Sequence, residues 1–302
     1  MCLGNARTSK ESLLLRYAYN TNGCANHRLD DAIALIAEAG YAGVALTLDW
    51  HHFDPFADDW RAQAEGLRQN LSRRGLACMI ETGARYLLDP RTKHEPTLIN
   101  PRAEGRAHRV EFLKRALDVQ VALGGETVSC WAGVRQAGVT PEQAHSYLRD
   151  GLREVLDYAA EVGGEVSLEP EPGMLIETNA DYVQLTEALG AEYGDRLRLA
   201  LDLGHVWVTG EAFPEVPETD LAPAAAVYGF AERLGAVAIE GMDRGVHVHK
   251  PLDEGDMPVA PLVSALEAVG YDRLVSVELS RESPRAHLAI PESIAVLKSL
   301  EG

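Results

Sequence analysis

The chain alternates eight times between a short run of β-forming residues and a longer amphipathic stretch. We predict strands at residues 13–19, 43–48, 76–81, 127–131, 165–169, 197–202, 236–240 and 274–279. Between them, apolar residues recur at helical spacing, most clearly at 29–40, 103–124 and 142–163. Because no proline- or glycine-rich linker divides the eight units, the pattern predicts one α/β domain, a single (β/α)₈ TIM barrel over residues 13–302.

The main alternative fold is an open, doubly wound sheet. That fold commonly carries a GxGxxG turn after its first strand, but the residues that follow the first strand here are NTNGCANH. We therefore expect the closed barrel. Residues 1–12 lack the apolar segment of a signal peptide and are expected to form a disordered leader.

Composition argues against nucleic acid and membranes as partners. The chain has 46 acidic and 28 basic residues, a net charge of −18, and should repel phosphate backbones and anionic lipids. Its four cysteines are scattered without CxxC spacing, which indicates a reducing, cytoplasmic location without disulfides. We expect a small polar substrate as the partner. A homodimer is left open, because the apolar-rich connection at 212–234 could form a subunit contact or a lid instead of a plain helix.

Polar residues that can bind ligands follow nearly every predicted strand. In a TIM barrel these positions lie together at the carboxyl end of the strands, where active sites form. The opposite loops, at 38–42 and 266–273, carry ordinary turn residues. The polar residues in question are Asn20, Asn22, Asp49, His51, His52, Asp54, Glu81, Trp131, Glu169, Glu171, Asp202, His205, His247, His249 and Glu278.

Three of these residues, Glu169, Asp202 and Glu278, would point carboxylates at the barrel axis. Converging carboxylates raise one another's pKa unless a cation neutralises them. Nearby histidines would make a mixed oxygen and nitrogen site, suited to a divalent transition metal such as Mn²⁺, Zn²⁺, Fe²⁺ or Co²⁺. Any one of these acids could instead be a solvated loop residue or a helix N-cap. Residue type alone does not choose between Glu169 and Glu171 as the ligand from the fifth strand.

The histidines at these strand ends fall into two pairs and a single residue. His205 follows Asp202 by three residues, and His247 and His249 would project to the same face of an extended segment. His51 and His52 are adjacent, so only one of them can face the centre of the barrel.

Several segments together resemble the xylose isomerase-like TIM-barrel superfamily: SLEPEPG, LRLALDLGH, HVHKPLDEGD and SVEL. That superfamily includes sugar isomerases and epimerases, inosose dehydratases and endonuclease IV-type AP endonucleases. YNTNG, GVALTLDWHHFDP and ETGARYLLDP further resemble a bacterial branch described as sugar phosphate isomerase/epimerase-like. The resemblance implies Glu169, Asp202 and Glu278 as metal ligands. It also implies a histidine in the seventh strand, but Ala238 occupies that position and cannot bind a metal.

The AP endonuclease branch implies a second, histidine-rich centre built from His205, His247 and His249. Two interpretations of Ala238 follow. Either these histidines compensate for the missing ligand, or the metal site has decayed and the pair is a remnant.

These residues predict a metal-dependent isomerase or epimerase of a sugar, cyclitol or hydroxy-ketone, working by proton transfer next to a carbonyl. Glu169 and Glu278 would be both ligands and acid/base groups. The alternatives are a metal-dependent hydrolase of a small phosphoester and a non-catalytic barrel with a degenerate site. The residues expected to bind the substrate are Asn20, Asn22, His52, Trp131, Arg135 and Glu171.

Overall fold

A computed structural model describes residues 14–301 and shows a closed barrel of eight parallel strands. The order around the barrel is β1-β10-β7-β6-β5-β4-β3-β2, so barrel strands that are consecutive along the chain are also neighbours in space. The predicted TIM barrel is confirmed, and the predicted leader at 1–12 lies outside the described residues. The barrel strands are β1 Arg16–Asn20, β2 Gly43–Thr47, β3 Ala77–Glu81, β4 Val128–Trp131, β5 Val166–Glu169, β6 Leu197–Asp202, β7 Leu234–Ile239 and β10 Leu274–Val277.

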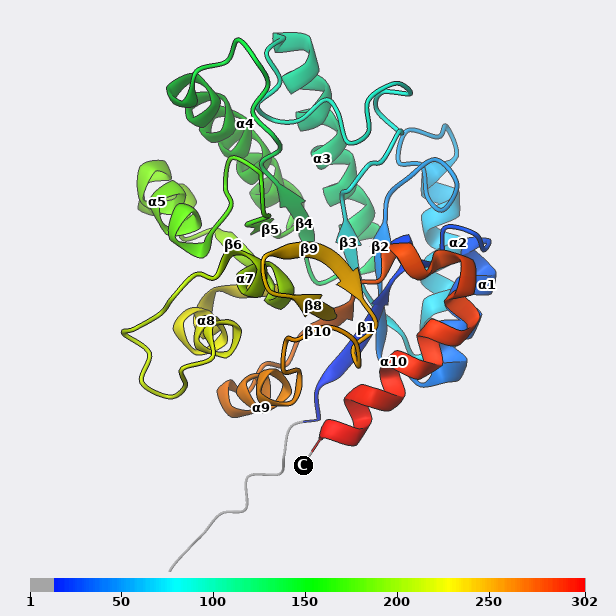
Figure 1. The fold of residues 1–302 in the computed structure, drawn as a ribbon. Coiled ribbons are helices and arrows are strands. Elements are labelled where there is room, and N and C mark those ends of the chain that lie inside the picture. The colour runs from blue at the N-terminus through cyan, green and yellow to red at the C-terminus, as the bar shows by residue number, and fades with distance from the viewer. Residues whose placement is uncertain (1–13, 302) are drawn as a thin grey trace, which may run out of the picture.

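Helices surround the ring of strands on all sides (Figure 1). They are α1 Leu29–Ala39, α2 Trp60–Arg74, α3 Ala103–Leu123, α4 Pro141–Val162, α5 Asn179–Leu189, α6 Ala191–Gly194, α7 Leu203–Thr209, α8 Ala222–Phe230, α9 Ala260–Val269 and α10 Ala286–Leu300, with 3₁₀ turns η1 Thr21–Cys24, η2 Ala231–Arg233 and η3 Ser280–Arg285. Within 14–301, none of these helices has the length and apolarity that a membrane span requires.

Local sequence explains where the long helices begin and end. The Thr140 hydroxyl accepts the Gln143 N–H and the Gln143 side chain accepts the Thr140 N–H, a capping box that starts α4 with Pro141 in its first turn. Gly40 ends α1, in a left-handed conformation (φ 88°) that glycine adopts without strain.

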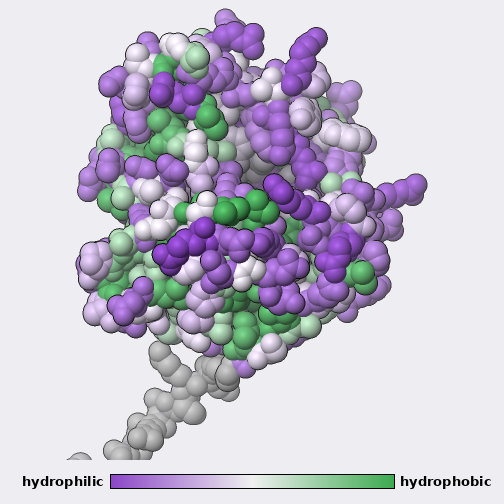
Figure 2. All heavy atoms as spheres, in the orientation of Figure 1, coloured by the Kyte–Doolittle hydropathy of each residue, from purple (hydrophilic) through white to green (hydrophobic). Residues whose placement is uncertain are grey.

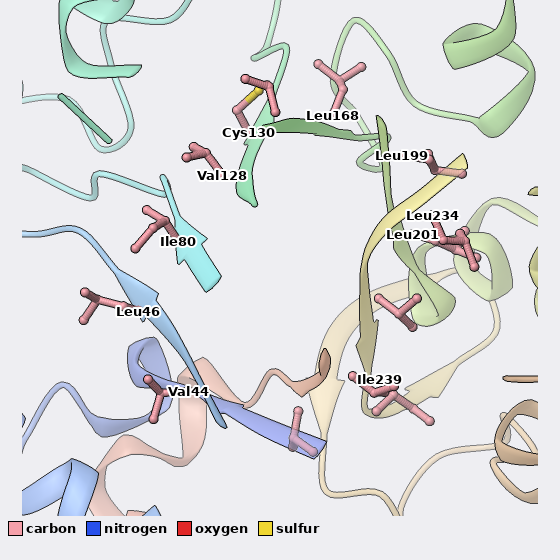
Figure 3. Close-up of a cluster of buried hydrophobic side chains, with 14 of the residues drawn as sticks. Val44, Leu46, Ile80, Val128, Cys130, Leu168, Leu199, Leu201, Leu234 and Ile239 are labelled. Carbon is pink, nitrogen blue, oxygen red and sulfur yellow. The ribbon is translucent and has the colours of Figure 1, made fainter. Parts of the chain in front are cut away.

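The strands carry two different apolar faces. Side chains such as Leu46, Ile80, Leu168, Leu201 and Ile239 point outward from the ring toward the helices (Figure 3). The inward positions carry a separate cluster of mostly small residues: Ala18, Ala45, Met79, Ala200, Ala236 and Leu274. This inner cluster closes the barrel below the level of the polar strand ends.

Two additional short strands, β8 Gly241–Asp243 and β9 Val246–Lys250, form an antiparallel hairpin directly after β7. The hairpin crosses in front of the barrel where the strands end (Figure 1). It contains the predicted extended segment with His247 and His249. The connection at 212–234 is less regular than the predicted helix, because α8 begins only at Ala222.

Candidate active-site cavity and metal centre

A cavity of about 710 Å³ lies at the carboxyl ends of the strands. Hydrophilic side chains predominate on this face of the molecule (Figure 2). Predicted residues that line the cavity are Asn20, Asn22, His51, Glu81, Trp131, Glu169, Glu171, His205, His247, His249 and Glu278. The structure therefore brings together most of the strand-end residues singled out in the sequence.

Parallel register places the polar ends of neighbouring strands at one level. Trp131 is paired with Glu169, and Asp202 is paired with Ala238. Asp202 is also the N-cap of α7, where its Oδ1 accepts the His205 N–H at 2.9 Å. The turn from β6 into α7 thus holds the His205 ring beside Asp202.

Three imidazoles form the densest group of donor atoms. The Nε2 atoms of His205 and His247 are 3.0 Å apart, and one ring nitrogen each of His205, His247 and His249 lies within 4.8 Å of the others. Nδ1 of His205 is 3.1 Å from the Pro170 carbonyl oxygen, which can only accept a hydrogen bond. This contact assigns the proton to Nδ1 and leaves Nε2 as a lone pair facing His247.

His249 follows the same rule. Its Nδ1 is 3.1 Å from the backbone carbonyl oxygen of Glu278, so Nδ1 carries the proton and Nε2 is free. Two histidines from different elements are thus fixed in the tautomer that metal-binding histidines use.

Carboxylates surround this histidine group. Glu169 Oε1 lies 3.5 Å from His205 Nδ1, and Asp202 Oδ2 lies 3.5 Å from His205 Nε2. Asp202 Oδ2 is buried without a hydrogen-bond partner in the described part of the chain. Donor atoms of Glu169, Asp202 and His205 lie within 4.8 Å of one another, which is the spacing that a shared cation requires.

Sequence reasoning missed Glu240, the most deeply buried carboxylate of the site. It lies two residues beyond Ala238 on the same face of the strand, and none of its surface is exposed. A Cβ on Gly204 would lie 2.0 Å from Glu240 Oε1, so only glycine leaves room for this carboxylate. Donor atoms of Asp202, Glu240 and His249 lie within 4.8 Å of one another. Because side chains alternate along a strand, Ala236, Ala238 and Glu240 share one face, and this alternation could have identified Glu240 from the sequence.

Burial and mutual repulsion shift the titration of these groups. Burial, with repulsion from Glu171 and Glu278, raises the pKa of Glu169 well above its usual range. Burial and the Glu278 carboxylate raise the pKa of Glu171 to about 8. Burial and Asp202 raise the pKa of Glu240 well above its usual range. Burial lowers the pKa of His205 to about 4, which keeps its ring neutral. Such a set of groups is stable only with bound protons or a bound cation.

Glu278 has a different environment from the other predicted ligands. Its Oε1 accepts a hydrogen bond from the Asn22 side-chain amide at 2.8 Å, and it belongs to none of the groups of closely spaced donor atoms among residues 14–301. Asn20 Oδ1 accepts from Asn22 N–H and from the Thr47 hydroxyl, which holds the loop after β1 against the cavity. Glu278 therefore lines the cavity without joining any of these donor groups in the described residues.

Two predicted substrate residues lie outside the cavity. Arg135 is exposed, and its guanidinium donates to the Val139 carbonyl at 2.7 Å as the loop turns toward α4. The Nε2 atom of His52 is 3.1 Å from the His27 carbonyl oxygen, and the residue faces a separate cleft beside α2. Its neighbour His51 lines the cavity. The prediction that Arg135 and His52 line the substrate space is corrected accordingly.

Three basic residues that were not predicted also line the cavity: Arg85, Lys93 and Arg281. Two of them belong to the loop after β3, in which Ala84, Arg85 and His94 adopt positive φ angles of 54°, 44° and 68°. Non-glycine residues in this conformation cluster at functional sites.

The comparison with protein families assigns the fold family. Residues 33–300 match the model of the xylose isomerase-like TIM barrel. The chain belongs to that family. No curated protein sequence matches it.

Solved structures with the same fold include several sugar epimerases. The 3-keto-D-glucoside 4-epimerase YcjR from E. coli is 18% identical, with a TM-score of 0.71, and the match covers 95% of this chain and 100% of that one. D-allulose 3-epimerase from Methylomonas sp. is 17% identical (TM-score 0.72; 95% and 98% covered). An AP endonuclease of family 2 from Brucella melitensis is 20% identical (TM-score 0.68; 95% and 99% covered).

Proposed function

We propose that this protein is a divalent-metal-dependent epimerase or isomerase of a small sugar, cyclitol or related hydroxy-ketone. The observation that carries the proposal is the convergence of Glu169 and Glu278 on one cavity that is also lined by His205, His247 and His249. Asp202 lies directly behind this lining, with Oδ2 3.5 Å from His205 Nε2. Family membership and the sugar epimerases among its structural neighbours support the same class of reaction.

The residues present fit a transition-metal ion. Asp202 Oδ2 and both oxygens of Glu240 are buried without hydrogen-bond partners within 14–301. The free Nε2 atoms of His205 and His249 add nitrogen donors, a mixture that suits Mn²⁺, Fe²⁺, Co²⁺ or Zn²⁺ better than Ca²⁺. In this proposal Glu240 replaces the ligand that Ala238 cannot supply. A bound ion would polarise the substrate carbonyl and stabilise negative charge on its oxygen.

The two glutamates would move the proton. Burial and neighbouring acids raise the pKa of Glu169, so its carboxylate form, which a bound cation would favour, has a high proton affinity for its role as a base. Asn22 donates to Glu278 Oε1 and fixes the orientation of that carboxyl group. A carboxylate on each side of a flat enediolate can take a proton from one face and return one to the other face, which is the requirement for epimerisation.

Basic residues in the cavity favour a substrate that carries an anionic group. Arg85, Lys93 and Arg281 line the same space as the acids in a chain whose net charge is −18. Phosphate or carboxylate on the substrate would pair with these cations. We therefore include sugar phosphates and sugar acids among the candidate substrates.

The test is an exchange assay in deuterated water with metal-loaded protein and a panel of ketoses, keto-glycosides, inososes and their phosphates. We expect deuterium at the carbon next to the carbonyl in at least one substrate. Glu169→Gln and Glu278→Gln should both abolish incorporation, and Glu278→Gln should retain bound metal because Glu278 belongs to none of the donor groups among residues 14–301. If metal-loaded protein incorporates no label across the panel, the isomerase proposal fails. If the protein also binds no metal, the non-catalytic barrel is favoured.

A second candidate function is hydrolysis of a small phosphoester. The three-histidine group of His205, His247 and His249 supports it, because clustered metal ions can activate water for attack on phosphorus. The AP endonuclease among the structural neighbours supports it as well. Release of inorganic phosphate from a panel of sugar phosphates, without deuterium incorporation into the remaining sugar, would select this function over isomerisation.

A further inference from the structure

A second group of donor atoms lies in the loop after β2, and one of its residues, His51, lines the cavity. Asp49, His51 and His52 come from a tight turn closed by a bridge between Asp49 and Phe53. One donor atom from each of the three residues lies within 4.8 Å of the other two. None of these residues belongs to the centre around Asp202, and the reaction proposed above uses none of them.

Asp49 has one oxygen committed to the turn and one without a partner. Its Oδ1 accepts the backbone N–H groups of His51 and His52 at 3.3 and 2.8 Å. Its Oδ2 is buried and has no hydrogen-bond partner among residues 14–301, and the whole residue is 0% exposed. A buried carboxylate oxygen without a partner is costly unless a cation or a proton neutralises it.

His52 presents a lone pair from a fixed tautomer. Its Nε2 is 3.1 Å from the His27 carbonyl oxygen, so this nitrogen carries the proton. Its Nδ1 is then unprotonated, and it is buried without a partner in the described residues. His205 and His249 show the same arrangement, in which one ring nitrogen donates to a backbone carbonyl and the other stays free. Metal-binding histidines commonly have this arrangement.

His51 completes the group. Its Nδ1 lies 3.1 Å from Asp49 Oδ1 but lacks the alignment of a hydrogen bond, and its ring is tilted by 38° against the His52 ring, with centroids 4.2 Å apart. Both ring nitrogens of His51 are buried without a hydrogen-bond partner in the described residues, so either nitrogen can serve as a metal ligand.

We propose that Asp49, His51 and His52 form a second binding site for a divalent transition metal, separate from the centre around Asp202. Two imidazoles and one carboxylate suit Zn²⁺, Fe²⁺ or Co²⁺, and three protein ligands leave coordination positions open. Because His51 lines the cavity, an ion held here borders the substrate space and can bind a substrate oxygen or a water.

The test first removes all metal from the protein and then dialyses it to equilibrium against Zn²⁺. Elemental analysis then counts the metal ions bound per chain. We expect two classes of site in the wild type. His51→Ala should weaken one class by at least about 100-fold, since even loss of a group behind a ligand costs up to that much. His205→Ala/His249→Ala should weaken the other class and leave the Asp49 site filled. His287→Ala, an exposed histidine on α10, is the matched control and should change neither.

A spectroscopic measurement reports on the site without removing a ligand. The Trp50 and His51 ring centroids are 4.9 Å apart, so Co²⁺ bound there should quench the Trp50 emission, measured as the difference between the emission of the wild type and that of Trp50→Phe. Unchanged Zn²⁺ stoichiometry and affinity in His51→Ala would overturn the proposal. So would Co²⁺ saturation that leaves the Trp50 emission of the wild type intact. Neither result depends on whether the protein is an isomerase, because no substrate is present.

Discussion

The interior of the barrel has two layers that face the same axis from the same strands. The lower layer is apolar: Ala18, Ala45, Met79, Ala200, Ala236 and Leu274. Two residues further along several of these strands, the upper layer carries Asn20, Thr47, Glu81 and Asp202, and Glu240 directly follows β7. The lower layer loses little by burial, whereas the upper layer buries carboxylates that repel one another. The difference indicates that the upper layer, with its buried carboxylates, lowers the stability of the metal-free fold, and that the lower layer does not.

The largest effect should follow neutralisation of the upper layer at Asp202. Asp202→Asn keeps an oxygen to cap α7 but loses the charge, so we expect metal affinity to collapse and kcat/KM to fall about 100- to 1,000-fold. Isothermal titration with Zn²⁺ and the exchange assay measure the two effects. Asp195→Asn, an exposed carboxylate near Arg233, is the control. Full activity of Asp202→Asn would show that the upper layer is not the metal centre.

A change in the lower layer should lower the stability of the fold and leave metal affinity almost unchanged. Met79 is almost fully buried among alanines, so Met79→Ala leaves a cavity and should lower the free energy of unfolding by about 2–4 kcal/mol. Metal affinity should change by less than about threefold if the two layers are energetically separate. Urea unfolding of the metal-free protein and Zn²⁺ titration measure the two quantities. A loss of metal affinity as large as that of Asp202→Asn would erase the distinction between the layers.

Glu240 tests whether the upper layer lowers stability. Glu240→Gln removes a buried carboxylate, so the metal-free protein should become about 1 kcal/mol more stable while its metal affinity falls at least about 10-fold. Gly204→Ala should weaken metal binding by displacing the same carboxylate, because its Cβ would lie 2.0 Å from Glu240 Oε1. Gly66→Ala, where a Cβ meets open space, is the control. Unaltered metal affinity in both Glu240→Gln and Gly204→Ala would remove Glu240 from the centre.

The smallest effect concerns pH. Burial and Glu278 raise the pKa of Glu171 to about 8, above the ordinary value of about 4.3 in an unfolded chain. The folded state then binds more protons between these values, so the stability of the metal-free protein should fall as pH rises from about 4.5 to about 8. We expect a decrease of a few degrees in Tm over that range, to be measured by calorimetry. Saturating Zn²⁺ should flatten the dependence. A metal-free Tm that rises over this range would contradict the assigned direction.

The same contrast separates what the sequence predicted from what it missed. Strand-end positions can be read from local periodicity, and this is why Glu169, Asp202 and the His247/His249 pair were found. Glu240 was missed because the prediction stopped at Ala238. Its place in the site depends on β7 extending beyond that residue and on the space left by Gly204. Arg135 and His52 were misplaced because the path of a loop after its strand is not periodic.

By itself the sequence determined the eight-unit barrel and the end of it where polar residues line a cavity. Alternation of side chains along a strand and the spacing of helices are local properties of the chain. Only the tertiary structure decided which donor atoms come within a few ångströms of one another and which histidine nitrogens are free. Those features depend on register between neighbouring strands, on the hairpin over the barrel mouth, and on backbone carbonyls at Pro170, His27 and Glu278. Each of these contacts joins residues distant in sequence, so no local pattern encodes them.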